Sequence, residues 1–137
     1  MTGIQFENYI ESKLRSRSDI SNLKKHPEIL LNGACKHHFD FECSKNEETI
    51  VIECKHYDYT SEGNVPSGKI STLNEAVFFL EKLNPEIKKV LCLNKSAQAD
   101  SSGRTLAERY VEKYSSLMED ILVYEVDTAA RTAKRLR

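Results

Sequence analysis

The sequence lacks several features that would place a protein in a class at once. No apolar run approaches the roughly 20 residues that cross a bilayer, and charged residues make up 30% of the 137 residues. The first residues show no basic stretch followed by an apolar one, so we expect no secretory leader and a cytoplasmic location. No glycine-rich phosphate loop, serine nucleophile motif, helix-turn-helix, zinc finger or internal repeat is recognisable. The chain is long enough for one domain with its own core.

Cysteine is scarce and shows no metal-binding or disulfide pattern. The four cysteines include no CxxC pair. A zinc site could be assembled from the cysteines and histidines between residues 35 and 56, but their spacing does not suit a zinc knuckle. We expect reduced thiols, with Cys43 and Cys54 as small core residues, and no organic cofactor.

Neither sign of charge dominates the composition. Lysine and arginine total 20, aspartate and glutamate total 21, and the formal net charge is −1. This balance does not point to a nucleic-acid-binding protein. It does not exclude one, because a metal site concentrates acids and binding depends on where the basic residues lie.

The most informative stretch is HFDFECSKNEETIVIECKH, residues 38–56. Apolar and polar residues alternate on both sides of a polar break, which is typical of a β-hairpin. If the turn is centred on Asn46 and Glu47, residues whose numbers sum to 93 face each other, and Asp40 lies opposite Glu53. The reverse face then points into a core, and it carries Phe39, Phe41, Ile50 and Ile52.

This register creates an electrostatic problem at one end of the hairpin. Two carboxylates opposite each other on one sheet face repel and destabilise the pairing. Lys55 projects from the same face as Glu53, roughly 6–7 Å further along the strand. A divalent metal held by Asp40 and Glu53, with Lys55 alongside, would remove the repulsion and form a reactive centre. The alternative is a solvent-facing sheet surface; the strongly apolar start of the second strand favours a site.

These residues also carry a resemblance. Asp40, twelve intervening residues and Glu53-Cys54-Lys55 at the end of an apolar strand resemble the PD-(D/E)xK nuclease superfamily, and HHFDF with IVIECKHY is most similar to Mrr-type restriction endonuclease domains. The resemblance implies a restriction-endonuclease-like α/β fold, in which helices flank a mixed sheet made of an antiparallel hairpin and a βαβ unit. It also implies Mg²⁺, with Mn²⁺ able to substitute, bound by Asp40, Glu53 and the main-chain carbonyl of Cys54. Phe39 stands where the superfamily's name has a proline, a position that varies.

The first helix is predicted over residues 3–15. Thr2 and Gln5 can form a capping box, and apolar residues recur at four-residue spacing. The domains that this sequence resembles carry an acid on the first helix that reaches toward the metal, and Glu7 lies where that acid would be. A surface ion pair is the alternative for Glu7.

The rest of the chain alternates helices and strands. Residues 16–27 are polar and basic, and we expect a linker or a ragged helix end there. Hydrophobic periodicity predicts further elements: a strand over 28–34, a helix beginning near Ser67, a strand over 88–93, a helix over 106–117 and a strand over 121–126. The nuclease-like domain would then span residues 1–127, and residues 128–137 would form a basic tail, either a short helix or disordered.

Three residues near the hairpin could contact substrate. His56 and Tyr57 follow the second strand and lead into a loop over 60–68, which could form a lip beside the metal site. Lys69 lies in the first turn of the next helix, which in the domains that this sequence resembles borders the active site. Core packing, capping or simple solvation is the alternative for each of them.

The combined prediction is a metal-dependent endonuclease of restriction type that hydrolyses phosphodiester bonds of DNA. Glu7, Asp40, Glu53 and Lys55 would be its catalytic residues, and Lys55 would act on the attacking water. A domain this small could work as a homodimer in which each subunit cuts one strand. The alternatives are a non-catalytic nucleic-acid- or protein-binding module on the same fold, and a junction resolvase or RNase. A binding module has no need of mutually repelling carboxylates, which favours catalysis.

Overall fold

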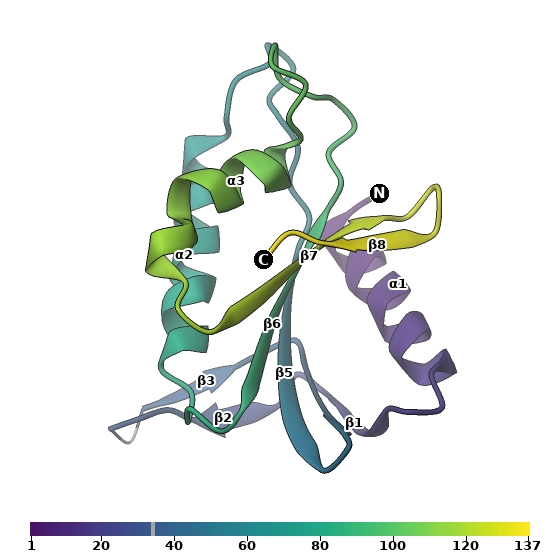
Figure 1. Cartoon of the computed structure of the whole chain (residues 1–137), viewed down its shortest axis with the longest axis vertical. Coiled ribbons are helices and arrows are strands. Elements are labelled where there is room, and N and C mark those ends of the chain that lie inside the picture. The colour runs from purple at the N-terminus through teal and green to yellow at the C-terminus, as the bar shows by residue number, and fades with distance from the viewer. Residues whose placement is uncertain (34) are drawn as a thin grey trace.

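A mixed sheet with helices on both of its faces forms the body of the molecule (Figure 1). The computed structural model describes residues 1–33 and 35–137. The six-stranded sheet has the order β1-β4-β5-β6-β7-β8, and β2 and β3 pair in a separate two-stranded sheet. The elements are α1 (Gly3–Ser16), β1 (Ser21–Lys25), β2 (Glu28–Leu30), β3 (Lys36–His38), β4 (Phe41–Lys45), β5 (Glu48–Lys55), α2 (Ser67–Glu81), β6 (Lys88–Asn94), α3 (Leu106–Tyr114), a 3₁₀ turn (Ser115–Leu117), β7 (Ile121–Asp127) and β8 (Thr132–Arg135).

The predicted combination of a hairpin and parallel crossovers is confirmed. Strands β4 and β5 are antiparallel, whereas β5, β6 and β7 are parallel and connected through α2 and α3. Parallel neighbours need crossover connections, and the two helices supply them. The carboxyl ends of β5 and β6 therefore lie at the same end of the sheet.

The predicted register of the hairpin is also confirmed. Phe41 lies opposite Ile52, so paired residue numbers sum to 93. Asn46 and Glu47 both have left-handed backbones, with φ of 51° and 66°. Two consecutive residues of this kind match the twist of a tight hairpin. The ladder ends at the pair of Phe41 and Ile52. Asp40 and Glu53 are the next residues on the two segments, just beyond the last pair.

Phe39 does not share a face with Phe41, which corrects the predicted alternation. Phe39 packs with Val51 on the side of the sheet that carries α2 and α3, whereas Phe41 packs with Ile52 on the side of α1. Two residues, Phe39 and Asp40, separate the end of β3 from the start of β4. The alternation of period two assumed one continuous strand, and this break resets it.

Each face of the sheet has its own hydrophobic core, as Figure 1 shows by the helices on either side. The larger core lies under α2 and α3 and includes Leu73, Leu80, Leu91, Tyr110 and Val123. The smaller core lies under α1 and includes Phe6, Ile10, Cys43, Cys54 and Val90. Cys43 and Cys54 are thus buried small core residues, as predicted.

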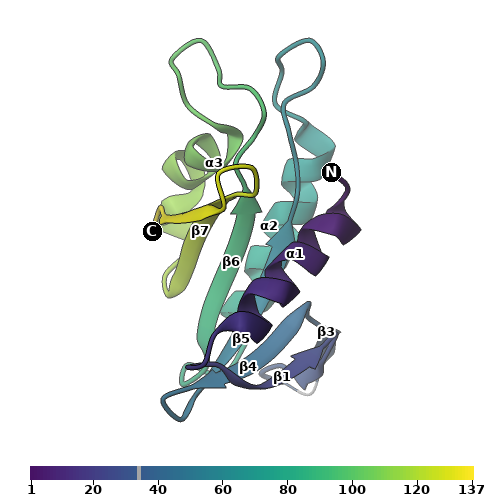
Figure 2. The ribbon, with the colours of Figure 1, turned by 90° about the vertical axis from the view of Figure 1, so that its right-hand side faces the viewer.

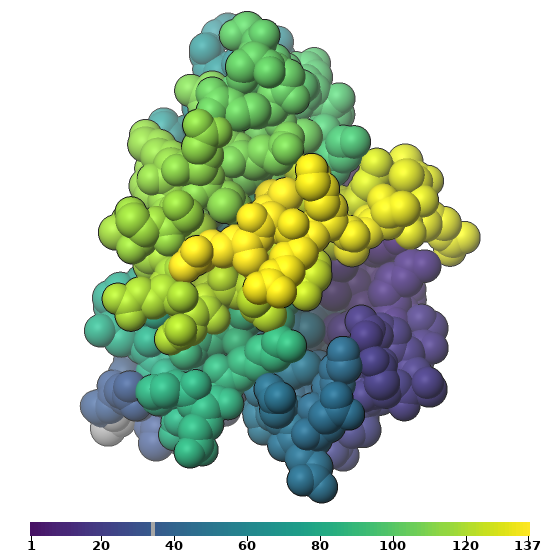
Figure 3. Space-filling view, in the orientation of Figure 1, coloured from purple at the N-terminus to yellow at the C-terminus, as the bar shows by residue number. Residues whose placement is uncertain are grey.

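Three segments differ from their predicted conformation. The expected linker over 16–27 contains β1, which pairs with β4 at the edge of the main sheet. The expected strand over 28–34 is shorter: β2 pairs with β3 in the small sheet, and Ala34 lies outside the described residues. Residues 128–137 are neither helical nor disordered, because β8 pairs antiparallel with β7. Figure 3 shows these last residues, in yellow, on the surface beside α3.

Within residues 1–33 and 35–137, none of the helices has the length and apolar character needed to cross a membrane.

Candidate metal centre

Asp40 and Glu53 meet where the β4–β5 ladder ends. The main-chain N–H of Asp40 donates to Oε1 of Glu53 at 2.8 Å, and the N–H of Cys54 donates to Oδ2 of Asp40 at 2.7 Å. Each carboxylate is therefore held by the backbone of the other segment. Since the N–H and C=O of one strand residue point to the same edge, the carbonyl of Cys54 also points toward Asp40.

Glu53 is a buried carboxyl group in a crowded electrostatic setting. Its side chain is only 5% exposed. Burial, followed by the charge of Asp40, raises its pKa to about 8, and Lys55 partly opposes that rise. The negative charge of this group is poorly compensated by the protein itself.

Glu7 approaches Asp40 from α1. The capping box of Thr2 and Gln5 starts this helix as predicted, and Phe6 and Ile10 fix its buried face against the sheet. Burial and the neighbouring charge of Asp40 raise the pKa of Glu7, whereas His26 and Lys55 lower it. The structure thus brings Glu7 beside Asp40, at the position where the sequence resemblance placed a helical acid.

His26 is a member of this cluster that the sequence did not reveal. One ligand atom from each of Glu7, His26 and Asp40 lies within 4.8 Å of the others. The backbone of His26 is left-handed, with φ of 50°, and its N–H donates to the main-chain oxygen of Asp40 at 2.9 Å. A single histidine in a polar stretch carries no spacing signal. Only the pairing of β1 with β4 brings it to Asp40.

The carboxylates of the cluster are not neutralised by ion pairs. Among residues 1–33 and 35–137, no lysine, arginine or histidine nitrogen comes within 4.0 Å of a carboxylate oxygen of Glu7, Asp40 or Glu53. Lys55 lies at the end of β5 and lowers the pKa of both glutamates. The site therefore joins three carboxyl groups, one imidazole and one ammonium group, and burial together with the proximity of the acids disfavours the charged forms of Glu7 and Glu53.

The three predicted substrate-contacting residues lie on two sides of β5. The ring of His56 lies 5.6 Å from that of Phe6, on the side of α1. Tyr57 lies on the side of α2, where its hydroxyl group is 2.6 Å from that of Thr72. The Nζ of Lys69 is 5.6 Å from the centre of the Tyr57 ring. The structure thus brings Tyr57 and Lys69 together and leaves His56 next to the helix that carries Glu7.

Two loops project beyond the end of the sheet that bears this cluster (Figure 2). They follow β5 and β6, and polar contacts connect them. Asp58 accepts a hydrogen bond from the N–H of Ala97 at 2.9 Å, and the hydroxyl group of Tyr59 donates to the main-chain oxygen of Arg104 at 3.1 Å. The expected lip is therefore part of a two-loop structure.

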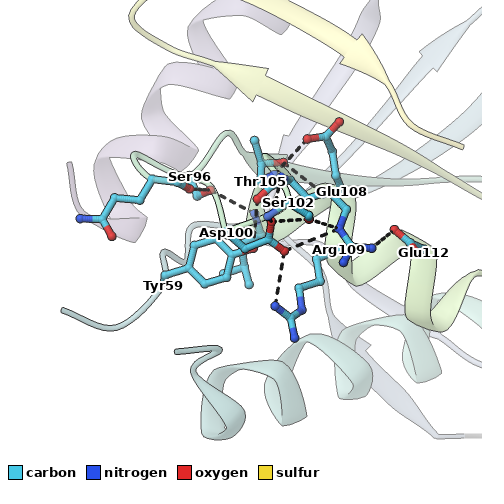
Figure 4. A network of polar contacts seen from close by, with 11 residues as sticks. Tyr59, Ser96, Asp100, Ser102, Thr105, Glu108, Arg109 and Glu112 are labelled. Atoms are coloured by element: carbon cyan, nitrogen blue, oxygen red, sulfur yellow. Dashed lines mark hydrogen bonds and ion pairs between the residues drawn. The ribbon is translucent and has the colours of Figure 1, made fainter. Parts of the chain in front are cut away.

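Asp100 holds the second loop in shape (Figure 4). Its Oδ1 accepts hydrogen bonds from the N–H groups of Ser102 and Arg104, each at 2.9 Å, and from the hydroxyl group of Ser102 at 2.6 Å. Its other oxygen lies 3.4 Å from the guanidinium group of Arg109. Hydrogen bonds from Ser102 and Arg104 lower the pKa of Asp100 to about 2. This carboxylate is fully partnered, unlike those of the cluster, and so has a structural role.

An apolar groove of about 320 Å³ lies elsewhere, between α1 and the sheet. Its lining includes Leu14, Ile50, Val90 and Tyr124, and none of the acidic residues of the cluster.

Comparison with solved structures supports the fold. No family model matches the chain, and no curated protein matches its sequence. Solved structures do match. An XisH family protein from Nostoc punctiforme superposes with a TM-score of 0.58 at 12% identity, over 96% of this chain and 98% of that one. An fdxN element excision controlling factor protein from Anabaena variabilis gives 0.59 at 11% identity, with the same coverage.

A third structure, a Thermococcus gammatolerans assembly of McrB AAA+ hexamers with bound McrC, gives a TM-score of 0.53 at 13% identity. The match covers 97% of this chain and 30% of that one. The fold is restriction-endonuclease-like, as the resemblance in the hairpin implied.

Proposed function

We propose that this protein is a metal-dependent nuclease. The observation that supports this most is the crossed pair of hydrogen bonds that holds Asp40 and Glu53 together at the carboxyl end of β5, with Lys55 two residues further along. Mutual repulsion between two acidic groups held this close together costs stability. Their arrangement therefore suits the binding of a cation better than a role in stabilising the fold.

The residues present fit a divalent metal. Hard cations prefer oxygen ligands, and Asp40 and Glu53 offer carboxylate oxygens that have no cationic side chain within ion-pair distance in the described part of the chain. The carbonyl of Cys54, which points to the same edge, would complete the set that holds Mg²⁺, with Mn²⁺ able to substitute. Glu7 would join directly or through water. When bound, the ion would lower the pKa of a coordinated water and relieve charge on the phosphoryl oxygens.

The chain's own residues would do the remaining work. The ammonium group of Lys55 would orient the attacking water and stabilise the charge that develops on the phosphate. Tyr57 and Lys69, which lie side by side, would contact the nucleic acid beside the cut, and His56 would do so from the side of α1. The two loops that Asp58 and Tyr59 connect would border the substrate.

DNA is the proposed substrate and a restriction-type endonuclease the proposed activity. Both rest on the likeness of Asp40 and Glu53-Cys54-Lys55 to the PD-(D/E)xK pattern. A homodimer would allow each subunit to cut one strand of a duplex.

The test is cleavage of plasmid, single-stranded DNA and RNA with Mg²⁺, Mn²⁺ or EDTA. We expect metal-dependent cutting of DNA, and a loss of at least about 10²-fold in rate in Lys55→Ala, the scale of one transition-state contact. Lys36→Ala is the matched control, because Lys36 lies on β3 and pairs with Glu28 instead. Full activity in Lys55→Ala would remove this lysine from the mechanism. Binding of DNA without cutting under every metal would instead indicate a nucleic-acid-binding module, and preference for RNA or branched DNA would indicate an RNase or a resolvase.

A further inference from the structure

We propose that Glu7, His26 and Asp40 form a second cation position, selective for a first-row transition metal. It would lie beside the position of Asp40, Glu53 and Cys54. This inference rests on the proposed function in that it takes the acidic cluster to be a metal centre. It goes further by assigning His26, which the sequence pattern does not include, and by naming the class of metal.

Asp40 separates two sets of ligand atoms. Glu53 follows Val51 at period two, so its side chain leaves β5 on the side of α2 and α3. Glu7 belongs to α1, which packs on the opposite face. His26 follows β1 and is bound to the backbone of Asp40. The set of Glu7, His26 and Asp40 is thus on the other side of Asp40 from Glu53.

The set is close to the size that a cation requires. Ligand atoms at roughly 2.1 Å from an ion lie about 3–4.2 Å from one another in octahedral geometry, and those of the three side chains already lie within 4.8 Å of one another. His26 is exposed and the two acids are half-buried, so a small change of rotamer would close the set. Burial and the charge of Asp40 already disfavour the charged form of Glu7, which a cation would reverse.

The imidazole determines which metal the position prefers. Carboxylate and carbonyl oxygens suit Mg²⁺, whereas imidazole suits later first-row metals, and affinity rises along the series from Mn²⁺ onward. The position formed by Asp40, Glu53 and Cys54 offers oxygen alone. The two positions would therefore differ in selectivity, and only the one with His26 would place nitrogen on the metal.

The experiment uses Mn²⁺ as a spectroscopic probe of the full chain. Electron spin echo envelope modulation of bound Mn²⁺ detects ¹⁴N coupling from a coordinated imidazole. We expect this coupling in the natural protein and its loss in His26→Asn, together with at least about tenfold weaker Mn²⁺ binding at one position. Mg²⁺ affinity should change by less than about threefold. Asparagine is chosen because it tolerates the left-handed backbone of residue 26.

His38→Asn is the matched control. His38 is exposed, and its Nδ1 lies 3.4 Å from the main-chain oxygen of His26, yet it is outside the proposed set. The control should keep the coupling, and circular dichroism should show both variants folded. Coupling that survives in His26→Asn, or disappears in His38→Asn, would overturn the proposal. Bound Mn²⁺ without nitrogen coupling in the natural protein would overturn it too, while leaving the nuclease proposal intact. Absence of any divalent cation binding would remove both.

Discussion

Glu53 is a carboxyl group placed where its charge is disfavoured. It is almost wholly buried, and the neighbouring charge that affects it most is that of another acid, Asp40. Its pKa is about 8 in the metal-free folded protein and near 4.5 in the unfolded chain. Between these two pH values, Glu53 is mostly protonated in the folded protein and mostly ionised in the unfolded chain. Folding and proton binding are therefore linked at this residue.

The linkage predicts how the stability of the metal-free protein depends on pH. Between the unfolded pKa near 4.5 and the folded pKa near 8, the folded state binds more protons, so stability falls as pH rises through this window. In EDTA, we expect the denaturant concentration at the unfolding midpoint to decrease as the pH is raised from 5 to 8. Glu53→Gln should make this dependence on pH weaker. Glu86→Gln on the surface should leave it unchanged. A slope of the same size in Glu53→Gln would show that other groups cause it.

At the scale of elements, the sequence identified those with strong periodicity. The buried stripe of α2, the apolar runs of β6 and β7 and the capping box of α1 all form as predicted. It did not identify β1 and β8, whose residues are mostly exposed. Such edge strands have no apolar alternation, and they form because β4 and β7 offer unpaired backbone groups.

The caps of α1 and α3 allow an element-scale prediction. Both helices begin with a capping box, at Thr2 and at Thr105. The hydroxyl group of Thr105 also donates to Glu125, a buried residue of β7. Thr105→Val should therefore cost about 2–3 kcal/mol, the sum of a lost cap and a buried acceptor without its donor. Thr2→Val, at an exposed cap, should cost about 1 kcal/mol or less. Urea denaturation measures both, and equal losses would show that the contact with Glu125 contributes nothing.

At the scale of the whole molecule, the site joins segments that are distant in sequence. Glu7 comes from α1, His26 from the end of β1, Asp40 from the start of β4, and Glu53 and Lys55 from β5. The hairpin alone brings Asp40 and Glu53 together, and a hairpin can be recognised from local sequence. The proximity of these two residues could therefore be predicted. Glu7 and His26 lie beside Asp40 only because α1 packs against the sheet and β1 pairs with β4.

A cation bound by these segments should stabilise the entire fold. A ligand present at about 100 times its dissociation constant adds roughly 2.7 kcal/mol to the free energy of unfolding, which would raise the melting temperature by several degrees. We expect millimolar Mg²⁺ or Mn²⁺ to produce such a rise, EDTA to reverse it, and Asp40→Asn to abolish most of it. Asp19→Asn is the control, because Asp19 follows the carboxyl end of α1 and pairs with Arg17 and Lys45 instead. A melting temperature that no divalent cation shifts would count against the metal centre.

Sequence patterns were enough to predict the strongly periodic elements and half of the candidate site. The alternation of residues 38–56 predicted the hairpin, and the turn at Asn46 and Glu47 set the register that brings Asp40 to Glu53. The tertiary structure decided the rest. It placed β1 and β8 at the edges, turned Phe39 to the other core and brought His26 to Asp40. These outcomes depend on which backbone edges and side-chain faces remain free once the central strands have paired, and no local pattern contains that information.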